Sequence, residues 1–353
     1  MPQRLSDYLK KEYGEKVYRL SLSSGCTCPN RDGNICYSKT SDSYYFGVPA
    51  AGDDRLTGGC SFCSEGGSGE FAAGSTLPDI DVQIKEAKAL ICKKTCARKF
   101  IAYFQSYTNT YGDVSRLKKL YLEAITRDEI VALSIGTRPD CIGNDILEML
   151  KELNAIKPVW IELGLQTIHE KTAKRVNRGY ALSTFENTYK RLKDAGIIVI
   201  VHVILGLPGE SKKDMLETIQ YLSSLDPVLD GIKLQNLQIL KGTRMYEEFL
   251  RETSVENANN SDLNSIEASD RKTSTKEPDF HIMSMEEYTD LVAECIALLP
   301  KETVVHRMTG DGPRRLLVAP LWSLDKKRVL NMLTQKTGKL FSYHTPHTHS
   351  PRG

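Results

Sequence analysis

Short apolar runs alternate along the chain with segments in which apolar residues recur at helical spacing. Six runs have the length and the β-branched or aromatic content of buried strands. They span residues 16–23, 99–105, 130–137, 158–166, 196–206 and 231–240. The five amphipathic segments between them predict helices over residues 81–94, 115–126, 144–155, 183–196 and 212–225. The fourth of these ends in "LKDAG", where Gly196 suits the position that follows a helix.

Strands that alternate with helices form parallel βαβ units, because a helical crossover returns the chain to the same edge of the sheet. Such crossovers are right-handed, so a repeated series curls into a barrel or an open part of one. We therefore expect an α/β fold, a partial (β/α)6 TIM-like barrel. In such folds the chemistry lies on the loops after the carboxyl ends of the strands. Those loops here contain the polar stretches "SSGCTCPNRDG", "QSYTNTYG", "TRPDC", "LQTIHE", "GLPGE" and "LKGTR".

Two stretches interrupt the alternation and divide the chain. Residues 34–57 show no clear period, so we expect an insertion in the loop that follows the first cysteines. In residues 253–280, twelve of 28 are Ser, Thr or Asn, a composition that predicts a flexible polar insertion. The expected organisation is a partial barrel over residues 1–250, these two insertions, a basic C-terminal extension packed on the barrel over 281–340, and a disordered tail over 341–353.

The composition is that of an ordinary folded protein, and an excess of positive charge is concentrated in one segment. The 353 residues are 40% hydrophobic and 26% charged, as in an ordinary folded protein. The net charge of +2 says little, but residues 301–353 hold ten Lys or Arg against three Asp or Glu. Such a segment is typical of a surface that binds a polyanion, and equally of a solvated basic tail.

The chain shows no apolar run long enough to span a membrane, and its polar start lacks the apolar core of an export signal. We therefore expect a cytoplasmic protein. Thiols stay reduced in that compartment, so close-set members of the nine cysteines are better explained as metal ligands or catalytic groups than as disulfides.

The stretch "GGCSFCSEGG" contains Cys60 and Cys63 with Phe62 between them, and "SSGCTCPNRDG" supplies Cys26 and Cys28 upstream. Thiolates select zinc, copper(I) or iron–sulfur clusters. A zinc site would use all four cysteines, but one residue between Cys26 and Cys28 is poor spacing for two corners of a tetrahedron. Three thiols would instead hold a cubane cluster with one iron open. The Phe62 ring suits a flat ligand as well as a place in the core.

Further motifs accompany these cysteines: "GTRPDC", "ELGLQT", "VNRGY", "GLPGE", "DGIKLQ" and "HRMTGDG…LLVAPLW". Together with "CPNRDG…GGCSFC", they occur in the order found in a bacterial radical S-adenosylmethionine (SAM) family. That family is related to the radical SAM domain of the Elongator catalytic subunit. The chain resembles it from about Lys10 to Trp322, with breaks at the two insertions.

The resemblance implies a 4Fe–4S cluster bound by Cys28, Cys60 and Cys63, with SAM chelating the open iron through its amino and carboxylate groups. It also implies an electron donor such as flavodoxin or ferredoxin, and a 5′-deoxyadenosyl radical that abstracts hydrogen from a substrate. Cys26 matches no ligand position in the family. The family's loop between the first and second ligands is shorter, so residues 34–57 must loop out, which costs little closure entropy.

Residues at the strand ends are the expected contacts with SAM. Arg138 suits either a carboxylate or a salt bridge within the rim. Glu162 lies in a predicted barrel strand and needs a polar partner there, such as ribose hydroxyls. Arg178 is expected to approach the SAM carboxylate. The full set of expected cofactor contacts is Phe62, Gln105, Thr137, Arg138, Glu162, Gln166, Arg178, Gly206 and Gly209.

The "GLPGE" turn, one cysteine and one histidine each allow more than one interpretation. In "GLPGE", Gly206 and Gly209 let the backbone pass close to a flat base, or they form an ordinary strand-to-helix turn. Cys141 follows an aspartate on the functional face and is the candidate catalytic thiol or hydrogen donor. His202, within an apolar strand, is expected to be a hydrogen-bonded core histidine.

The leading hypothesis for function is a radical SAM enzyme that modifies the wobble uridine of tRNA, because relatives in the family are linked to that nucleoside. The segment "HRMTGDGPRR" would supply cations near the barrel mouth. One alternative is the same chemistry on a small-molecule or peptide substrate. Another is a non-catalytic RNA-binding module stabilised by zinc. The sequence leaves the target atom and the oligomeric state open.

Overall fold

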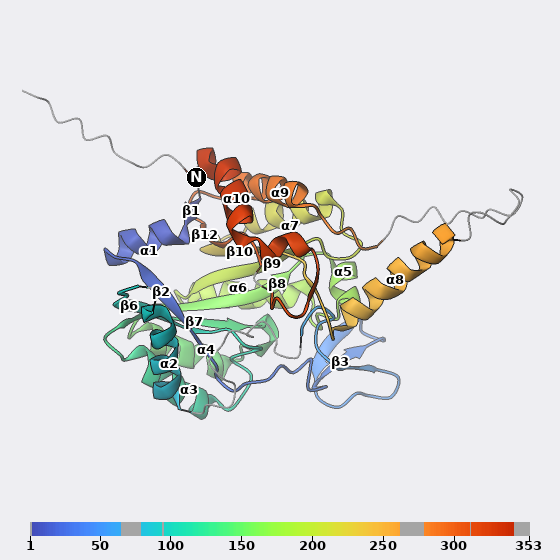
Figure 1. Cartoon of the computed structure of the whole chain (residues 1–353). Coiled ribbons are helices and arrows are strands. Elements are labelled where there is room, and N and C mark those ends of the chain that lie inside the picture. Colours follow the sequence, from blue (N-terminus) through green and yellow to red (C-terminus); the bar gives the residue numbers. More distant parts are fainter. Residues whose placement is uncertain (1, 65–78, 94, 262–278, 311, 342–353) are drawn as a thin grey trace, which may run out of the picture.

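A parallel sheet of eight strands, curled into a partial barrel, forms the centre of the fold (Figure 1). The structure, a computed structural model, describes residues 2–64, 79–93, 95–261, 279–310 and 312–341. The strand order is β1-β12-β10-β9-β8-β7-β6-β2, and every neighbouring pair is parallel. The strands are β1 (Gln3–Arg4), β2 (Val17–Leu22), β6 (Lys99–Phe104), β7 (Ile130–Thr137), β8 (Val159–Gln166), β9 (Ile198–Leu205), β10 (Gly231–Asn236) and β12 (Val304–Arg307).

Helices connect the strands of this sheet and most of them pack around it, whereas α8 (Arg244–Ser261) projects away from it (Figure 1). They are α1 (Leu5–Tyr13), α2 (Ile80–Cys92), α3 (Val114–Ile125), α4 (Asn144–Asn154), α5 (Glu170–Arg175), α6 (Leu182–Asp194), α7 (Lys212–Ser223), α8 (Arg244–Ser261), α9 (Met285–Leu298) and α10 (Lys326–Phe341). Among the described helices, none combines the length and the apolar character needed to cross a membrane.

The six strands and five helices predicted from the apolar pattern are all present, and the expected α/β partial barrel is confirmed. Both faces of a parallel sheet are covered, which explains the nearly continuous apolar runs. Along β8, Ile161 and Leu163 join the large core under the helices, while Glu162 faces the inside of the barrel. Gly196 adopts a left-handed φ of 70° after α6, as the "LKDAG" motif predicts.

Two strands of the central sheet, β1 and β12, were not predicted, because they are too short to show a period. The strand β12 lies between β10 and β1, so Val304 pairs with Gly231 on one side and with Gln3 on the other. The last predicted strand is also divided. Strand β10 ends at Asn236, and β11 (Ile239–Leu240) pairs antiparallel with β13 (Leu317–Ala319) in a separate sheet.

The sequence pattern of residues 34–57 shows no clear period, but the structure is regular there. These residues form a small antiparallel sheet in the order β4-β3-β5. Its strands are β3 (Ile35–Ser38), β4 (Ser43–Phe46) and β5 (Asp54–Leu56). The rings of Tyr37 and Tyr44 lie 5.1 Å apart across one strand pair. Asp42 forms an ion pair with Lys174 of α5 at 2.7 Å. The insertion is therefore an ordered flap beside the barrel.

The expected polar insertion at 253–280 begins inside a helix, because α8 continues to Ser261. Apolar residues before that boundary hold the helix in place. Phe249 packs edge to face on Phe280 with ring centroids 5.6 Å apart, and the Thr253 hydroxyl donates to the Phe249 carbonyl at 3.0 Å. The expected tail at 341–353 begins with Phe341, the last residue of α10, and residues 262–278 and 342–353 lie outside the described residues.

The C-terminal extension adds to the barrel rather than forming a separate body. It contributes β12 to the central sheet, and α9 contacts both α7 and α10. The Trp322 indole N–H donates to the Met283 carbonyl at 2.8 Å, which ties the segment after β13 to the start of α9. At the amino ends of the strands, Leu9 of α1 packs with Trp160 and Ile200 and closes that end of the barrel.

Candidate active site

A cavity of about 170 Å³ lies at the carboxyl ends of the barrel strands. This is the edge of the sheet on which the sequence predicts the chemistry. Nearly every strand of the barrel contributes to its wall. The strand-end residues that line it include Gln105, Thr137, Gln166, Ile204, Gln235 and Arg307.

Three thiols line this cavity: Cys28, Cys60 and Cys63. The small antiparallel sheet lies between Cys28 and the other two in sequence. Backbone hydrogen bonds fix the turns that carry the thiols. The amides of Arg31 and Asp32 each donate to the Cys28 carbonyl at 2.9 Å, and the Cys63 amide donates to the Cys60 carbonyl at 3.0 Å. The fold thus brings to one cavity the three cysteines that the resemblance implies as cluster ligands.

The cysteine loop, residues 58–64, is held from two sides. The Ser61 amide donates to the Val176 carbonyl at 2.9 Å, and the Ser61 carbonyl accepts from the Met245 amide at 3.0 Å. Phe62 packs on the apolar cluster that contains Val176 and Met245, and it also lines the cavity. The Phe62 ring therefore packs in the core on one side and lines the cavity, where it can face a ligand.

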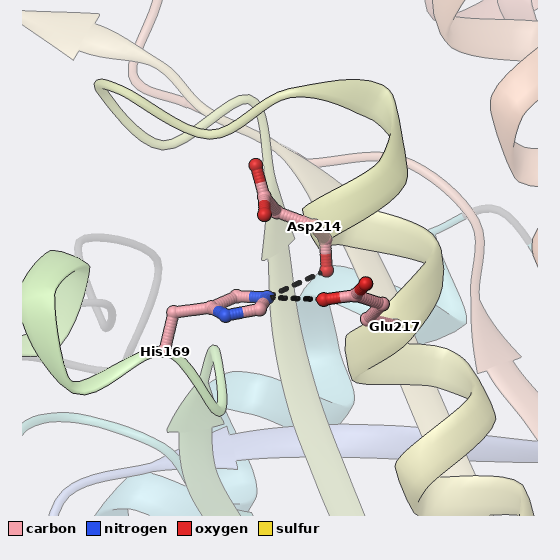
Figure 2. Close-up of side chains that lie close together, drawn as sticks. All are labelled: His169, Asp214 and Glu217. Carbon is pink, nitrogen blue, oxygen red and sulfur yellow. Dashed lines mark hydrogen bonds and ion pairs between the residues drawn. The ribbon is translucent and has the colours of Figure 1, made fainter.

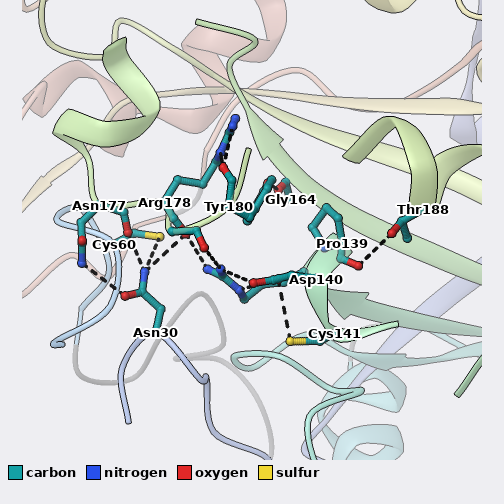
Figure 3. A network of polar contacts seen from close by, with 12 residues as sticks. Asn30, Cys60, Pro139, Asp140, Cys141, Gly164, Asn177, Arg178, Tyr180 and Thr188 are labelled. Carbon is teal, nitrogen blue, oxygen red and sulfur yellow. Dashed lines mark hydrogen bonds and ion pairs between the residues drawn. The ribbon is translucent and has the colours of Figure 1, made fainter. Parts of the chain in front are cut away.

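A polar network ties the cysteine loop to the barrel (Figure 3). The Asn30 side-chain amide donates to the Asn177 carbonyl at 2.6 Å and lies 4.0 Å from the Cys60 sulfur. Arg138, at the end of β7, donates to the Arg178 carbonyl at 2.8 Å. The segment after β2, the cysteine loop and the loop after α5 are thereby joined around the thiols.

The remaining upstream thiol, Cys26, does not line the cavity. Its side chain is buried in the main core, where Arg116 donates to its sulfur at 3.3 Å. The set of four cysteines considered for zinc is therefore not assembled, and three thiols remain at the cavity. This arrangement favours Cys28 over Cys26 as the upstream ligand.

We expect Cys26→Ala to leave the iron content of anaerobically purified protein unchanged, because this thiol contacts Arg116 in the core. The substitution should cost about 1–2 kcal/mol of stability through lost packing. Iron and sulfide analysis with a thermal melt measures both effects. A loss of iron would show that Cys26, and not Cys28, is the upstream ligand.

The surroundings of the cysteine pair favour a thiolate. A hydrogen bond from the Cys63 thiol, aided by the charges of Arg138 and Arg178, lowers the pKa of Cys60 to about 7. That hydrogen bond and burial raise the pKa of Cys63. Thiolates are the form of cysteine that binds metal, and cysteine thiolates hold iron–sulfur clusters. The donor set therefore fits a cluster.

The two arginines expected near the SAM carboxylate are occupied by protein partners, although both line the cavity. Arg138 forms a two-pronged pair with Asp140, at 2.9 Å from Nε and 2.7 Å from Nη2. The Arg178 guanidinium donates to the backbone carbonyls of Leu165, Thr167 and Tyr180. The salt bridge of Arg138 within the rim is therefore present, and its pairing with a ligand carboxylate stays a prediction.

Gln166 shows the signs of a ligand contact. Its φ of 66° lies in the left-handed region, which costs free energy for a residue with a side chain. Its Oε1 atom is buried and has no hydrogen-bond partner among the described residues. A buried acceptor of this kind is costly unless a ligand pairs with it. Gln105 and Thr137 line the same cavity, so all three stay predicted contacts with SAM.

Three expected site residues do not line the cavity. A side chain at Gly206 would meet Met283 at 2.9 Å, and the Gly209 amide donates to the Asp279 carbonyl at 2.8 Å. The C-terminal extension therefore covers the "GLPGE" loop, and the turn is structural. Cys141 is buried, and burial raises the pKa of its thiol, so it does not present a reactive sulfur to the cavity.

Glu162 lines the cavity and has its buried partners within the protein. Its carboxylate accepts from Tyr103 at 2.8 Å, from Ser134 at 2.9 Å and from His202 at 2.9 Å, and it pairs with Lys233. Burial alone would raise the pKa of this carboxyl. The charge of Lys233 and the hydrogen bond from His202 outweigh burial and hold it well below its usual range. The carboxylate is therefore ionised.

Sequence reasoning missed several polar residues inside the barrel. His202 is hydrogen-bonded, as expected of a core histidine, but it lines the cavity, and burial lowers its pKa to about 4. Lys233 is fully buried, and Arg307 also lines the cavity. The available signal was a single charge within an apolar strand, as in "GIKLQ", because such a charge needs a partner inside the protein.

A second group of possible metal ligands, His169, Asp214 and Glu217, lies outside this cavity (Figure 2). The His169 Nε2 atom is 2.9 Å from the Asp214 main-chain carbonyl and 4.0 Å from the Glu217 carboxylate. The Asp214 carboxylate accepts hydrogen bonds from Ser211 in the cap of α7. These hydrogen bonds explain why the three side chains gather near the start of α7, and we assign no metal to them.

Comparison with known proteins agrees with this geometry. The radical SAM superfamily profile matches residues 57–222, and the radical SAM C-terminal domain matches residues 266–339. YtqA of Bacillus subtilis is 34% identical over 339 residues, which cover 96% of this chain and 90% of YtqA. YhcC of Escherichia coli K12 is 33% identical over 315 residues, or 89% and 85% of the two chains.

More distant relatives share part of the chain or the fold alone. Elongator complex protein 3 of Saccharomyces cerevisiae is 27% identical over 191 residues, 54% of this chain but 29% of that protein. The structure of the archaeal Methanocaldococcus infernus Elp3 superposes with a TM-score of 0.56 at 18% identity, over 73% of this chain and 59% of that one. The radical SAM superfamily uses a 4Fe–4S cluster and SAM. Because relatives more than 30% identical align with nearly the whole chain, the protein belongs to the radical SAM superfamily and is an enzyme of that superfamily.

Proposed function

We propose that this enzyme cleaves SAM reductively at a 4Fe–4S cluster held by Cys28, Cys60 and Cys63, and that its substrate is the wobble uridine of a tRNA. The observation that carries the cluster assignment is the meeting of three thiols from two separate loops at one cavity. When bound, the cluster and SAM supply one-electron chemistry that removes a hydrogen atom from the substrate. A small electron carrier such as flavodoxin or ferredoxin would provide the electron.

The chain's own residues prepare the cavity for a nucleoside-bearing cofactor. Phe62 offers a ring face beside the thiols, and Gln166 offers an unpaired acceptor. The helix α1 closes the amino end of the barrel by packing on Trp160, which limits the access of water from that end. Exclusion of water and of stray hydrogen donors is what a cofactor of this kind needs from its protein.

Two features support an RNA substrate. The chain resembles a family that is related to the Elongator catalytic subunit, and relatives in that family are linked to the wobble uridine of tRNA. In addition, the exposed Arg314 and Arg315 follow β12, whose carboxyl end lies at the same edge as that of β10. The Gly310 amide donates to the Asn236 side chain at 3.1 Å, which holds this segment at the end of β10. Guanidinium groups are suited to phosphate.

Binding of tRNA to the purified holoenzyme should weaken steeply as salt is raised. Arg314→Gln and Arg315→Gln should each reduce the slope of log affinity against log salt by about one, because each removes one phosphate contact. Lys301→Gln is the matched control, since Lys301 is exposed but precedes β12 at the opposite edge of the sheet. Fluorescence anisotropy with labelled tRNA at several salt concentrations measures the slopes.

Mass spectrometry of tRNA nucleosides tests the substrate itself. A strain that lacks the gene should accumulate an unmodified or partly modified uridine at the wobble position, and the intact gene should restore it. Unchanged nucleosides, together with salt-independent tRNA binding, would contradict the RNA proposal. That outcome would point to a small molecule or a peptide as the substrate of the same chemistry.

A further inference from the structure

One arginine at the cavity has no hydrogen-bond or ion-pair partner within the described part of the chain. Four arginines line the wall: Arg31, Arg138, Arg178 and Arg307. The first donates to a carbonyl of the cysteine loop at 3.0 Å, the second pairs with a neighbouring carboxylate, and the third donates to backbone carbonyls. For Arg307, the described residues offer no hydrogen-bond or ion-pair partner. Its guanidinium, with five N–H donors, is left for a ligand.

A second donor lies next to this arginine. Arg307 is the last residue of β12 and pairs in register with Lys233 of β10. Gln235 lies two residues further along β10, on the same face of the strand, and it too lines the cavity. Among the described residues, its side-chain amide has no hydrogen-bond partner. A guanidinium and an amide therefore line the cavity from two neighbouring strands, toward the end of the sheet opposite β2.

The barrel interior beneath these donors carries an excess of positive charge. Arg19 lies there, with Nη2 3.1 Å from the His306 ring and with an Nε atom that is buried without a partner in the described chain. Lys233 is buried there too, and Glu162 is the carboxylate whose charge acts on both Lys233 and His306. Counting Arg307, the interior is cationic even without the charge of Lys233. An unbalanced charge in a poorly solvated cavity attracts an anion.

Arg307 comes from a different part of the fold than the residues tied to the thiols. The cysteine loop and Asn30 are joined to the loop after α5 and to Arg138 after β7. Arg307 instead enters the same cavity from β12, next to β10.

We propose that Arg307 and Gln235 form a subsite for a compact anionic group of the substrate, a carboxylate or a phosphate. The proposal rests on the cavity being the place where the substrate reacts, but it does not require that the substrate be a tRNA. A guanidinium fork binds either anion through two parallel hydrogen bonds, and Gln235 adds a third donor. The anion would fix the reacting end of the substrate between these two side chains and the cofactor.

Calorimetric titration of the full-length holoenzyme tests the subsite, with sodium phosphate and sodium acetate used as separate probes at constant ionic strength. We expect one site per chain, and we expect Arg307→Gln to weaken it by about tenfold or more, as for the loss of a charged hydrogen bond. Gln235→Leu should weaken it by less. Arg328→Gln is the matched control, because Arg328 is exposed on α10. The anion that binds more tightly identifies the chemical source.

Further readouts separate this proposal from others. The SAM affinity and iron content of Arg307→Gln should equal those of the unchanged protein, whereas failure of the cluster assignment would leave both proteins without iron. If Arg307→Gln does not fold by circular dichroism, Arg307→Lys decides, since it keeps the charge without the fork and should bind the anion more weakly. Equal anion binding in these variants, no binding by the unchanged protein, or a loss of SAM affinity would each overturn the subsite.

Discussion

Cys60→Ala should lose its iron and its reductive cleavage of SAM together, while the barrel stays folded. The thiol lines the cavity with Cys28 and Cys63, and the three lie on loops that are anchored by backbone hydrogen bonds independent of any side chain at position 60. Removal of one of three thiolates leaves a cluster with too few protein ligands. Iron and sulfide analysis, with measurement of 5′-deoxyadenosine after anaerobic reduction, should show both signals at background.

Cys92→Ala is the matched control, because Cys92 is an exposed thiol at the end of α2. It should keep the iron and the activity. Circular dichroism of Cys60→Ala should match that of the unchanged protein, which separates loss of a ligand from loss of the fold. Retained 5′-deoxyadenosine formation in Cys60→Ala would count against the set of three ligands.

Lys233→Met should destabilise the protein by about 3–5 kcal/mol, the range for breaking a buried ion pair by removing one partner. The partner Glu162 is fully buried and would keep a charge that its remaining hydrogen bonds only partly offset. Thermal melting of the holoenzyme measures the loss. Lys212→Met, which breaks the exposed pair with Glu294, should cost no more than about 0.5 kcal/mol.

The pH dependence of this loss has a defined sign. In the unchanged protein the folded-state pKa of Glu162 is depressed, so the stability it contributes is present at neutral pH and lost as pH falls through that value. Without Lys233, burial is no longer outweighed and the folded-state pKa rises. Acidification should then narrow the gap between Lys233→Met and the unchanged protein, and Lys233→Met/Glu162→Gln should recover much of the loss at neutral pH. A gap that widens in acid would contradict this account.

Local patterns predict what local chemistry determines. Apolar periodicity placed the six long strands and their helices, and Gly196 ends α6 in the left-handed conformation that its motif predicts. The two cysteine motifs predict thiols at the carboxyl edge, because parallel strands place the loops that follow them on one side of the sheet. The orientation of Cys26 toward Arg116 depends on packing against α3, which no spacing rule contains.

Long-range contacts account for the rest. The residue type at Glu162 suits a cofactor, yet its buried partner Lys233 comes from a strand distant in sequence. The "GLPGE" turn suits an open loop, but Met283 of the C-terminal extension covers Gly206. In each case the deciding neighbour is known only once the chain is folded, so a motif alone cannot choose between a ligand and a protein partner.

The pairing of β1 with β12 has a bearing on how this protein is made. Gln3 leaves the ribosome long before its partner in the sheet, Val304, has been synthesised. Contacts between such remote segments form late, since a long loop must close first. Until β12 is made, the edge of β10 has no neighbour and can recruit foreign strands, so we expect the emerging chain to be most prone to aggregation in that interval.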